Sequence, residues 1–329
     1  MPPRLDVSKI LKLISGGQTG ADVGGLEAAR LLGIPTGGTA PKGYKSAGLP
    51  SHGAKLRDVY KLVESPSADY EPRTMKNVDD AAATIAFLLK HSPGTGKTIG
   101  YAQTGRWQHG TRTPGLYVGG HRPVLVLDRV DSASAAKAIE DMLTKLNPQT
   151  LNVAGHREGS VPGLEQAVKR ALMRALSGKA PVDTRTALDR LLSNMHLLDE
   201  PIQDRFGIPY RSVEAAFQAA KTLDPETRKK IASLAGSSPQ WHGLPAKGAG
   251  RQVKLDPNWN ERRVKVMEYL LRQKFKQPKF ADALKSTGGA PIIELDPKGN
   301  DTFWAASSPL SGLNILGRIL EEIRLGLPR

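Results

Sequence analysis

Short apolar runs alternate with segments of helical period through the first half of the chain. The runs "KLISGG" (12–17), "RPVLVLD" (122–128) and "TLNVAG" (150–155) predict buried strands, because a strand covered on both faces is apolar throughout. A further run, "AAATIAFLL" (81–89), fits either a strand or the end of a helix. Segments with helical spacing of apolar residues lie at 21–33, 132–146 and 161–176. This alternation predicts an α/β domain whose parallel sheet carries helices on both faces.

The second half of the chain has a different pattern, with helical periods in most of its length. These helical segments lie at 213–223, 225–236, 258–275, 279–289 and 314–327. Only "PIIELD" (291–296) and "NMHLLDE" (194–200) resemble strands. We therefore expect a mainly helical domain with little sheet. Between the halves lies "SGKAPVDTRT", which is polar and contains a proline. The predicted boundaries are a first domain at 1–178, a linker at 179–186 and a second domain at 187–329.

Composition supports two globular domains. The 329 residues are 39% hydrophobic and 24% charged, which is enough to build ordinary cores. The chain has no cysteine, so disulfides, thiolate metal sites and a cysteine nucleophile are excluded. No apolar run approaches the roughly 20 residues that cross a bilayer, and the first residues lack the pattern of a signal peptide. We expect a cytoplasmic protein without a membrane partner; the sequence does not indicate its oligomeric state.

The formal net charge is +15, which favours a partner rich in negative charge. Lys and Arg exceed Asp and Glu by 24 − 15 = +9 in residues 1–180 and by 23 − 17 = +6 in residues 181–329. The excess is therefore shared by both halves. Residues 261–279 hold seven basic and two acidic side chains. This segment is either a solvated helix face or a nucleic-acid contact.

The stretch "HSPGTGKTIGYA" (91–102) resembles the phosphate-binding loop of an ATPase only superficially. The motif G-x-x-x-x-G-K-[ST] requires a glycine five residues before Gly96, and that position is His91. Pro93 also removes an N–H that such a loop would direct at phosphate. The ATPase interpretation is rejected. We instead interpret the segment as a second glycine-rich loop of a ligand site, with Lys97 supplying a cation.

The first wall of that site is "GGQTGAD" (16–22), which follows a predicted strand and precedes a predicted helix. Glycines allow a tight turn and a close approach to a ligand, and the following helix offers free N–H groups. Such a turn also serves simply to join a strand to a helix. It is not the G-x-G-x-x-G dinucleotide motif.

Four ordered motifs give the first half a family resemblance. These are "SGGQTGAD…GG…PKG" (15–43), "SPSADYEPRTMKNVDDAAATI" (65–85), the Gly-Thr-Gly segment and "LNVAGHREGSVPGL" (151–164). They resemble the family named as molybdenum carriers, a circularly permuted branch of the SLOG superfamily of Rossmann-like nucleotide-binding domains, over residues 10–176. The resemblance implies a site for a phosphorylated nucleotide or sugar. Asn77 and Asn152 fit turn capping equally well. Together, junctions and resemblance nominate Gly16, Gly17, Gln18, Thr19, Gly20, Asp22, Lys42, Arg73, Asn77, Thr95, Gly96, Lys97 and Arg157 as contacts.

Three polar residues of the second half fall on one helical stripe. In "YRSVEAAFQAAKTL" (210–223), Ser212 is a good N-cap, and Glu214, Gln218 and Lys221 follow at i, i+4 and i+7. The adjoining stripe is apolar, so the polar stripe either lines a cleft or forms an ordinary exposed face with side-chain pairs.

A second family resemblance favours the cleft. The motifs "LSNM" (192–195), "YRSVEAAFQAAK" (210–221), "AKGAGR" (246–251), "WNERRVKVM" (259–267), "LRQKF", "FW" (303–304) and "NILGRIL" (314–320) are similar to those of the NADAR family. The resemblance implies a mainly helical N-glycosidase. Its substrates would be ADP-ribose attached to guanine in DNA, or phosphoribosyl-aminopyrimidine intermediates of riboflavin synthesis. The histidine usual after the glutamate is Ala215 here.

We therefore expect Lys221 to be a nucleophile that attacks ribose C1, and Glu214 to be the proton shuttle. The expected partner is ADP-ribosylated DNA or an ADP-ribose-containing nucleotide, and the alternatives are hydrolysis of a phosphoribosyl metabolite or non-enzymatic sensing of an NAD-derived signal. No cofactor is expected, and no histidine has metal-ligand spacing. Trp259 and Trp304 are equally typical of a core. The candidate substrate-binding residues are Asn194, Arg211, Gln218, Lys247, Arg251, Trp259, Trp304, Asn314 and Arg318.

Overall fold

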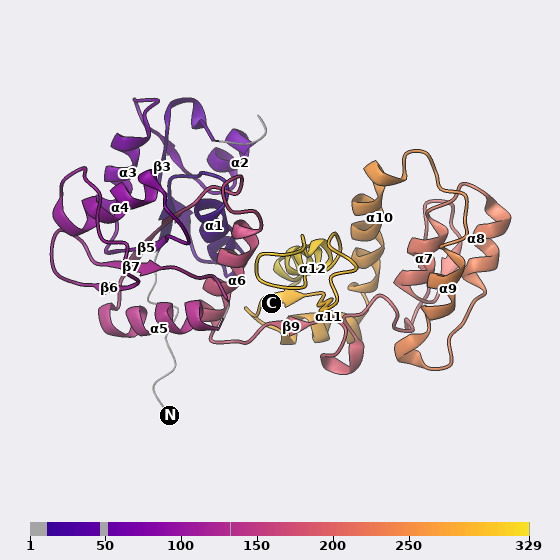
Figure 1. The fold of residues 1–329 in the computed structure, drawn as a ribbon. Coiled ribbons are helices and arrows are strands. Elements are labelled where there is room, and N and C mark those ends of the chain that lie inside the picture. Colours follow the sequence, from indigo (N-terminus) through magenta and orange to yellow (C-terminus); the bar gives the residue numbers. More distant parts are fainter. Residues whose placement is uncertain (1–11, 47–51, 132, 329) are drawn as a thin grey trace.

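The computed structural model describes residues 12–46, 52–131 and 133–328, which form an α/β domain followed by a mainly helical domain (Figure 1). The first domain is built on a six-stranded sheet of order β2-β1-β8-β5-β7-β6. All neighbours pair in parallel except the edge strand β6, which is antiparallel to β7. The predicted fold class is confirmed. The strands are β1 Lys12–Ser15, β2 Thr36–Gly37, β5 Ala83–Phe87, β6 Gly115–Tyr117, β7 Val124–Leu127 and β8 Thr150–Gly155.

Helices cover both faces of this sheet because alternate residues of its strands are apolar on each side. Ile85 and Phe87 of β5 pack with α1, α5 and α6, whereas Ala86 packs with α3 and α4. The segment 81–89 is therefore a strand, which decides between the two predictions. The helices are α1 Ala21–Leu31, α2 His52–Asp58, α3 Tyr70–Asp79, α4 Pro93–Thr104, α5 Ser134–Leu146 and α6 Leu164–Ser177, and β3 Thr39–Ala40 pairs with β4 Val63–Glu64.

The prediction of a glycine-rich loop at 91–98 is wrong, because this segment begins helix α4. Ser92 is the N-cap, its side chain accepts a hydrogen bond from the Thr95 N–H at 3.3 Å, and Pro93 occupies the first turn. Proline is well suited to that position, since the first turn has no use for its missing N–H. The glycines lie inside the helix, and Gly100 is required there because a Cβ would lie 1.9 Å from the Gln108 carbonyl oxygen.

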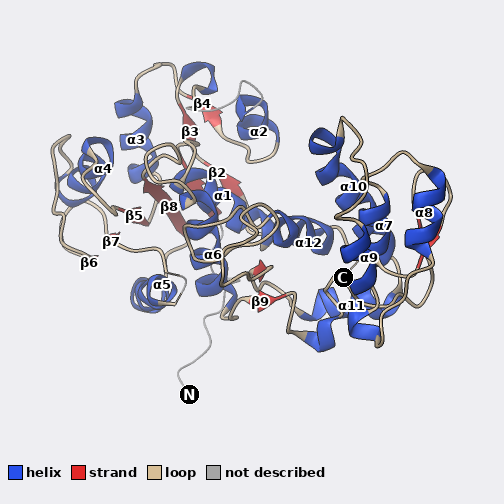
Figure 2. Cartoon of the chain, turned by 45° about the vertical axis from the view of Figure 1, so that its right-hand side comes forward, coloured by secondary structure: helices blue, strands red, loops and turns tan. Residues whose placement is uncertain are grey.

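The second domain is dominated by helices, as Figure 2 shows. Its helices are α7 Val213–Ala219, α8 Pro225–Ala232, α9 Leu244–Ala249, α10 Trp259–Lys274, α11 Pro278–Ser286 and α12 Ile315–Leu325. They enclose one core that includes Phe217, Trp259 and Leu271. The only strands within the described part of this region form two small pairs, β10 Ile202–Gln203 with β11 Pro209–Tyr210, and β9 Val182–Asp183 with β12 Ile292–Ile293.

Two predictions in this region need correction. The segment 194–200 is not a strand, because its backbone bonds to scattered loops: Leu197 N–H donates to Pro239 O and Leu198 N–H to Arg211 O, each at 2.7–2.8 Å. The segment 179–186, expected to be a linker, contains β9 and pairs with β12 of the helical domain.

Helix α12 lies between the two domains (Figure 1) and forms two ion pairs with helices of the first domain. Its Glu321 pairs with Lys169 of α6, and both side chains are almost fully buried. Glu322 pairs with Arg30 of α1. No helix of the described residues is long and apolar enough to cross a lipid bilayer.

Candidate functional site

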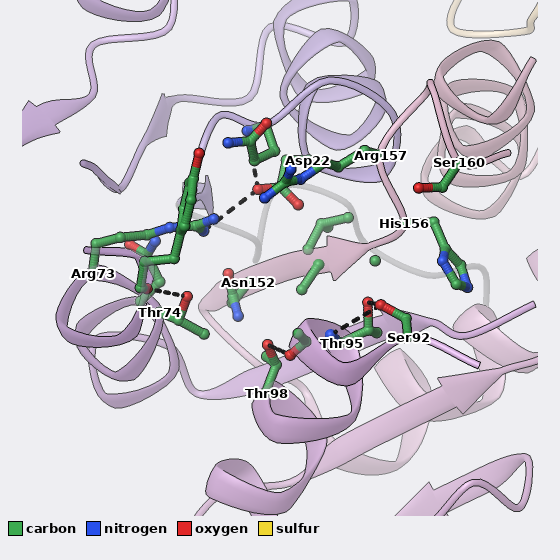
Figure 3. A pocket seen from close by; sticks show the side chains of 18 of the residues that line it. Asp22, Arg73, Thr74, Ser92, Thr95, Thr98, Asn152, His156, Arg157 and Ser160 are labelled. Carbon is green, nitrogen blue, oxygen red and sulfur yellow. Dashed lines mark hydrogen bonds and ion pairs between the residues drawn. The ribbon is translucent and has the colours of Figure 1, made fainter. Parts of the chain in front are cut away.

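The α/β domain has a cavity of about 330 Å³ at the carboxyl ends of its parallel strands (Figure 3). The turn after β1 contributes Gly16 and Gln18, the end of β8 contributes Asn152 to Arg157, and α4 contributes Ser92 and Thr95. The carboxyl edge of a parallel sheet is where open α/β folds bind ligands. The N-terminal ends of α1 and α4 both face this cavity, so their partial positive charges favour an anion.

Two arginines and a tyrosine form the most charged wall of this cavity. The guanidinium of Arg73 lies 3.5 Å from the carboxylate of Asp22, which also accepts a hydrogen bond from the Gln18 N–H at 3.1 Å. Arg73 and Arg157 lie 5.5 and 5.1 Å from the ring centroid of Tyr70. Burial lowers the pKa of Arg73 and raises the pKa of Asp22, although Arg73 and Arg157 oppose the second shift. The charges are thus desolvated, which strengthens their interaction with an anion.

Gly16 makes this arrangement possible, because a Cβ at that position would lie 1.4 Å from Arg73 Nη1. Asn77 lines the cavity and also bonds both backbone groups of Thr39, at 2.8 and 3.0 Å, so it has a structural role. Asn152 donates to the Thr84 hydroxyl at 3.2 Å.

Seven of the predicted contacts line the cavity, and six do not. The lining residues are Gly16, Gln18, Asp22, Arg73, Asn77, Thr95 and Arg157. Among the others, Lys97 lies over the Trp107 ring at 5.6 Å, and Gly96 packs against His109. Gly20 lies at the α1 N-cap with φ of 89°, where a Cβ would lie 2.4 Å from the His156 carbonyl oxygen. Outside the lining are Gly17, Thr19, Gly20, Lys42, Gly96 and Lys97.

The helical domain has a larger cavity, of about 640 Å³, beside α7. Ser212 caps α7 through a hydrogen bond from the Ala215 N–H at 3.1 Å, and the apolar stripe of the helix is buried in the core. Glu214, Gln218 and Lys221 all line the cavity, so the polar stripe borders a cleft. Gln218 Nε2 donates to Glu214 Oε1 at 2.7 Å.

The local environment shifts the pKa values of Glu214 and Lys221 in opposite directions. Burial raises the pKa of the Glu214 carboxyl, an effect that Gln218 and the nearby cations partly oppose. Burial lowers the pKa of the Lys221 amine, and Glu214 opposes that shift while Lys247 and Arg251 add to it. Desolvation thus favours a protonated carboxyl and a neutral amine, which are a proton donor and a nucleophile.

Aromatic rings and a polar group complete the walls. Trp259 and Trp304 both line the cavity, at 5.0 and 5.3 Å from Phe217 between ring centroids. They are therefore at once part of the core and part of the cavity wall. Asn194 Oδ1 is buried in the wall without a hydrogen-bond partner among the described residues, so it can accept a bond from a ligand.

Three predicted substrate-binding residues lie outside this cavity. Asn314 is buried and bonds the backbone of Ile292 and Glu294, at 2.9 Å each. Arg318 lines a separate cavity at the domain boundary with Glu27 and Glu322. Arg211 is exposed. The predicted residues that do line the cavity are Asn194, Glu214, Gln218, Lys221, Lys247, Arg251, Trp259 and Trp304.

Three carboxylates that the sequence pattern did not indicate also line this cavity: Asp296, Asp301 and Glu294. Glu294 is the one held by polar neighbours from β9 and the residues after it. Its side chain accepts a hydrogen bond from the Thr184 hydroxyl, and Arg185 lies 4.0 Å away. Burial raises the pKa of Glu294 to about 7, against the opposing effect of Thr184. Arg185 and Arg190, from the segment around the predicted linker, also line the cavity. The sequence could not indicate that these residues meet, because they are more than a hundred residues apart and only the pairing of β9 with β12 brings them together.

Sequence comparison matches each half of the chain to a known protein family. Residues 185–328 match the NADAR domain. N-glycosidase YbiA of Escherichia coli is 33% identical over 120 residues, which cover 36% of this chain and 71% of that protein. The chain belongs to the NADAR family. Its residues 13–176 match the circularly permutated YpsA SLOG family. The predicted resemblances are thereby confirmed.

Further relatives cover one of the two domains each. Riboflavin biosynthesis protein PYRR of Zea mays is 28% identical over 138 residues. The matched region covers 39% of this chain but only 22% of the maize protein. A Syntrophus aciditrophicus structure named as a molybdenum carrier protein covers 51% of this chain and 95% of its own, at 32% identity and a TM-score of 0.41. The NMR structure of E. coli YbiA covers 44% of this chain and 83% of its own, at 29% identity and a TM-score of 0.36.

Proposed function

We propose that the NADAR domain is an N-glycosidase that releases ADP-ribose from guanine bases of DNA. Membership of the NADAR family and similarity to YbiA, whose name is N-glycosidase, support a glycosidase-like function. The observation that carries the proposal is that Glu214 of α7 and Lys221, in the turn just after α7, line one cavity and have opposite pKa shifts.

The proposed reaction exchanges one bond at the ribose C1 atom for another. The neutral amine of Lys221 attacks C1, the C1–N bond to the base breaks, and Glu214 gives its proton to the leaving nitrogen. Opening of the sugar ring then forms an imine between Lys221 and C1. The Glu214 carboxylate activates a water that hydrolyses the imine and releases the sugar.

The remaining walls suit an ADP-ribosyl group. Lys247, Arg251 and Arg263 supply positive charge for a pyrophosphate, and Trp259 and Trp304 offer aromatic surface for a ribose or a base. A volume of about 640 Å³ is within the range of roughly 300–1,000 Å³ for small-molecule sites.

Borohydride trapping tests the covalent step. Reduction during turnover of ADP-ribosylated single-stranded DNA is expected to attach ADP-ribose to Lys221, and Lys221→Ala is expected to lower kcat by at least about a thousandfold. Lys254→Ala, at an exposed site of the same domain, is the matched control and keeps full activity. An adduct that still forms in Lys221→Ala contradicts the role of this lysine.

The substrate assignment has two rivals that the same protein distinguishes. The similarity to a protein named for riboflavin biosynthesis favours hydrolysis of a phosphoribosyl-aminopyrimidine. Cleavage of that metabolite but not of ADP-ribosylated DNA supports this rival. If neither is cleaved, yet ADP-ribose raises the Tm, the protein is a sensor of an NAD-derived nucleotide.

We further propose that the SLOG domain binds the phosphates of a nucleotide in its own cavity. The support comes from the two helix N-termini and from the desolvated Arg73 and Arg157 beside Tyr70.

Equilibrium dialysis with ADP-ribose tests this second site. The unaltered protein is expected to bind two equivalents, and Arg157→Ala is expected to weaken one of them by about tenfold, which is the loss of one charge-assisted hydrogen bond of ~1.5 kcal/mol. Arg251→Ala is the control, because it alters only the NADAR cavity. A single equivalent that Arg157→Ala leaves unchanged contradicts the proposal.

A further inference from the structure

A second cavity of the NADAR domain, of about 270 Å³, lies beside α10 and does not belong to the proposed active site. Its apolar lining comes from Ala220 at the end of α7 and from Val266 and Leu270 of α10. Helix α7 packs against both α8 and α10 in this part of the domain, and Figure 1 shows it between them. A cavity of this size is slightly below the range of small-molecule sites, roughly 300–1,000 Å³, and suits a single planar group.

The two cavities occupy neighbouring faces of the same helix. Arg263 and Met267 of α10 line the proposed active site, whereas Arg262, Val266 and Tyr269 line the second cavity. Residues three or four apart lie on one face of a helix, so positions 263 and 267 share one face, and positions 262, 266 and 269 share another. The two faces are about 100° apart around the helix axis, which is the rotation between neighbouring residues. Because a helix with its side chains is about 10 Å across, the sites are within about one helix diameter of each other.

Positive charge surrounds the second cavity. Arg205, Arg228, Arg262 and Lys265 line it, and Asp204 is its only carboxylate among the described residues. Arg262 is paired with the buried carboxylate of Asp256, whereas Arg205 and Lys265 are exposed. Burial lowers the pKa of Arg262, and the neighbouring charges of Arg205 and Arg228 lower it further.

Arg228 is built into the cavity wall and keeps one donor free. Its side chain is 1% exposed; Nη1 donates to Asp204 at 2.6 Å and Nε to Thr222 O at 2.7 Å. Its Nη2 has no hydrogen-bond partner within the described part of the chain. A buried guanidinium donor without a partner costs free energy, which an anionic ligand would recover.

Exposed aromatic rings border the same cavity. Tyr269 is 51% exposed and Phe206 is 55% exposed, which is unusual for rings of this size. Arg205 and Arg228 lie over the Phe206 ring, at 4.7 and 4.5 Å from its centroid. Exposed rings interleaved with arginines are the surface on which single-stranded nucleic acids stack their bases, while the cations hold the phosphates.

We propose that this second cavity binds a nucleotide of single-stranded DNA next to the modified guanine, with its base against Tyr269 and its phosphate at Arg205, Arg228 and Lys265. This inference rests on the proposed function, because it extends the DNA substrate beyond the cleaved bond. It gives the enzyme a physical means of preferring a DNA strand to a free nucleotide, since only a strand reaches both faces of α10.

The binding test uses unmodified, fluorescein-labelled single-stranded DNA of about 12 nucleotides, because site sizes for such surfaces are roughly 4–16 nucleotides. The variant Arg205→Glu/Lys265→Glu reverses two exposed charges and is expected to weaken the affinity at low salt by at least about tenfold and to reduce the salt slope by about 1 to 2. Tyr269→Ala is expected to weaken binding by about fivefold or more through lost stacking. Lys145→Glu, an exposed position on α5, is the matched control.

The hydrolysis test compares two substrates with the same variant. For ADP-ribosylated DNA, kcat/KM is expected to fall by about tenfold, and for ADP-ribosylated guanosine it is expected to stay within about twofold. An unchanged affinity for DNA overturns the inference, and so does an equal loss on both substrates, which would indicate damage to the fold. The inference is also overturned if the charge-reversed variant loses affinity for heparin and for DNA equally while Tyr269→Ala leaves the DNA affinity unchanged. That result would indicate a surface that binds any polyanion.

Failure of the proposed function gives a different result. If the unaltered protein cleaves neither substrate, the glycosidase proposal fails. The charge-reversed and Tyr269→Ala variants still show, by their DNA affinity alone, whether the second cavity holds a DNA strand.

Discussion

Lys274 is a buried amine that has no anionic partner among the residues the structure describes. The side chain at the end of α10 is fully buried, donates to Ser193 O at 2.7 Å, and lies 5.2 and 5.0 Å from the Phe275 and Phe280 ring centroids. Burial lowers the pKa of Lys274 to about 7. His196 and Lys279 are titratable groups that contact the same Phe280 ring. Because Ser193 precedes Asn194 of the proposed active site, Lys274 also fixes one wall of the cavity.

The free energy of unfolding is therefore expected to rise with pH above about 7. Below pH 7 both states bind the proton, so the cost of a buried charge is fully present; between 7 and about 10.5 only the unfolded chain binds it, which stabilises the native state. Lys274→Met is expected to stabilise the protein at pH 6, and this advantage is expected to shrink by about 2–3 kcal/mol at pH 9.

Urea unfolding at the two pH values measures this difference. Lys276→Met, at an exposed neighbouring position, should show no such dependence. Because the charge of Lys274 contributes to the lowered pKa of His196, all three proteins also carry His196→Gln, which removes that titration from the comparison. A Lys274→Met advantage that is equal at pH 6 and pH 9 contradicts the assignment.

Residue spacing and the family resemblance predicted that Glu214, Gln218 and Lys221 lie on one side of a cleft, but not what surrounds them. Helix α7 ends at Ala219, so the helical period relates Glu214 to Gln218, and the turn that follows brings Lys221 to the same cavity. Glu294 comes from a strand segment that pairs with β9, and no local pattern shows what a distant strand faces. Arg318 illustrates the reverse error: it lies in a matching motif, yet α12 directs it to the domain boundary.

At the scale of elements, the apolar runs predicted β1, β7 and β8 correctly, and helical spacing predicted α1, α5 and α6. The apolar pattern of these elements is unambiguous, because each of them contributes side chains to a hydrophobic core. Helix α4 was missed because its glycines and proline indicate a loop, although Ser92 followed by Pro93 is a typical helix start. Residues 194–200 alternate like a strand, but loops, and not a partner strand, bond their backbone.

Correcting α4 also changes the chemistry expected of this element. A loop with Lys97 would present a cation to the phosphate, whereas the helix presents its N-terminal turn and directs Lys97 toward Trp107. The positive charge at the SLOG cavity therefore comes from Arg73 and Arg157, on α3 and on the turn after β8.

At the scale of the whole molecule, one buried ion pair joins the domains. Lys169 of α6 pairs with Glu321 of α12, their side chains are 2% and 1% exposed, and Glu321 also accepts the Ile292 N–H at 3.0 Å. Burial lowers the pKa of Lys169, against the opposing effect of Glu321. Removing only one partner leaves a buried charge uncompensated, which typically costs about 3–5 kcal/mol, whereas replacing both is often nearly neutral.

Glu321→Gln is therefore expected to weaken the contact between the domains more than Lys169→Met/Glu321→Gln does. Calorimetry should show two separated unfolding transitions for the single variant, because the SLOG and NADAR domains then unfold independently. The double variant should restore most of the lost stability and bring the transitions together again. Equal destabilisation by the single and double variants would mean that this pair carries no coupling, and that the other contacts of α12 with α1, which include the Arg30–Glu322 pair, unite the two domains.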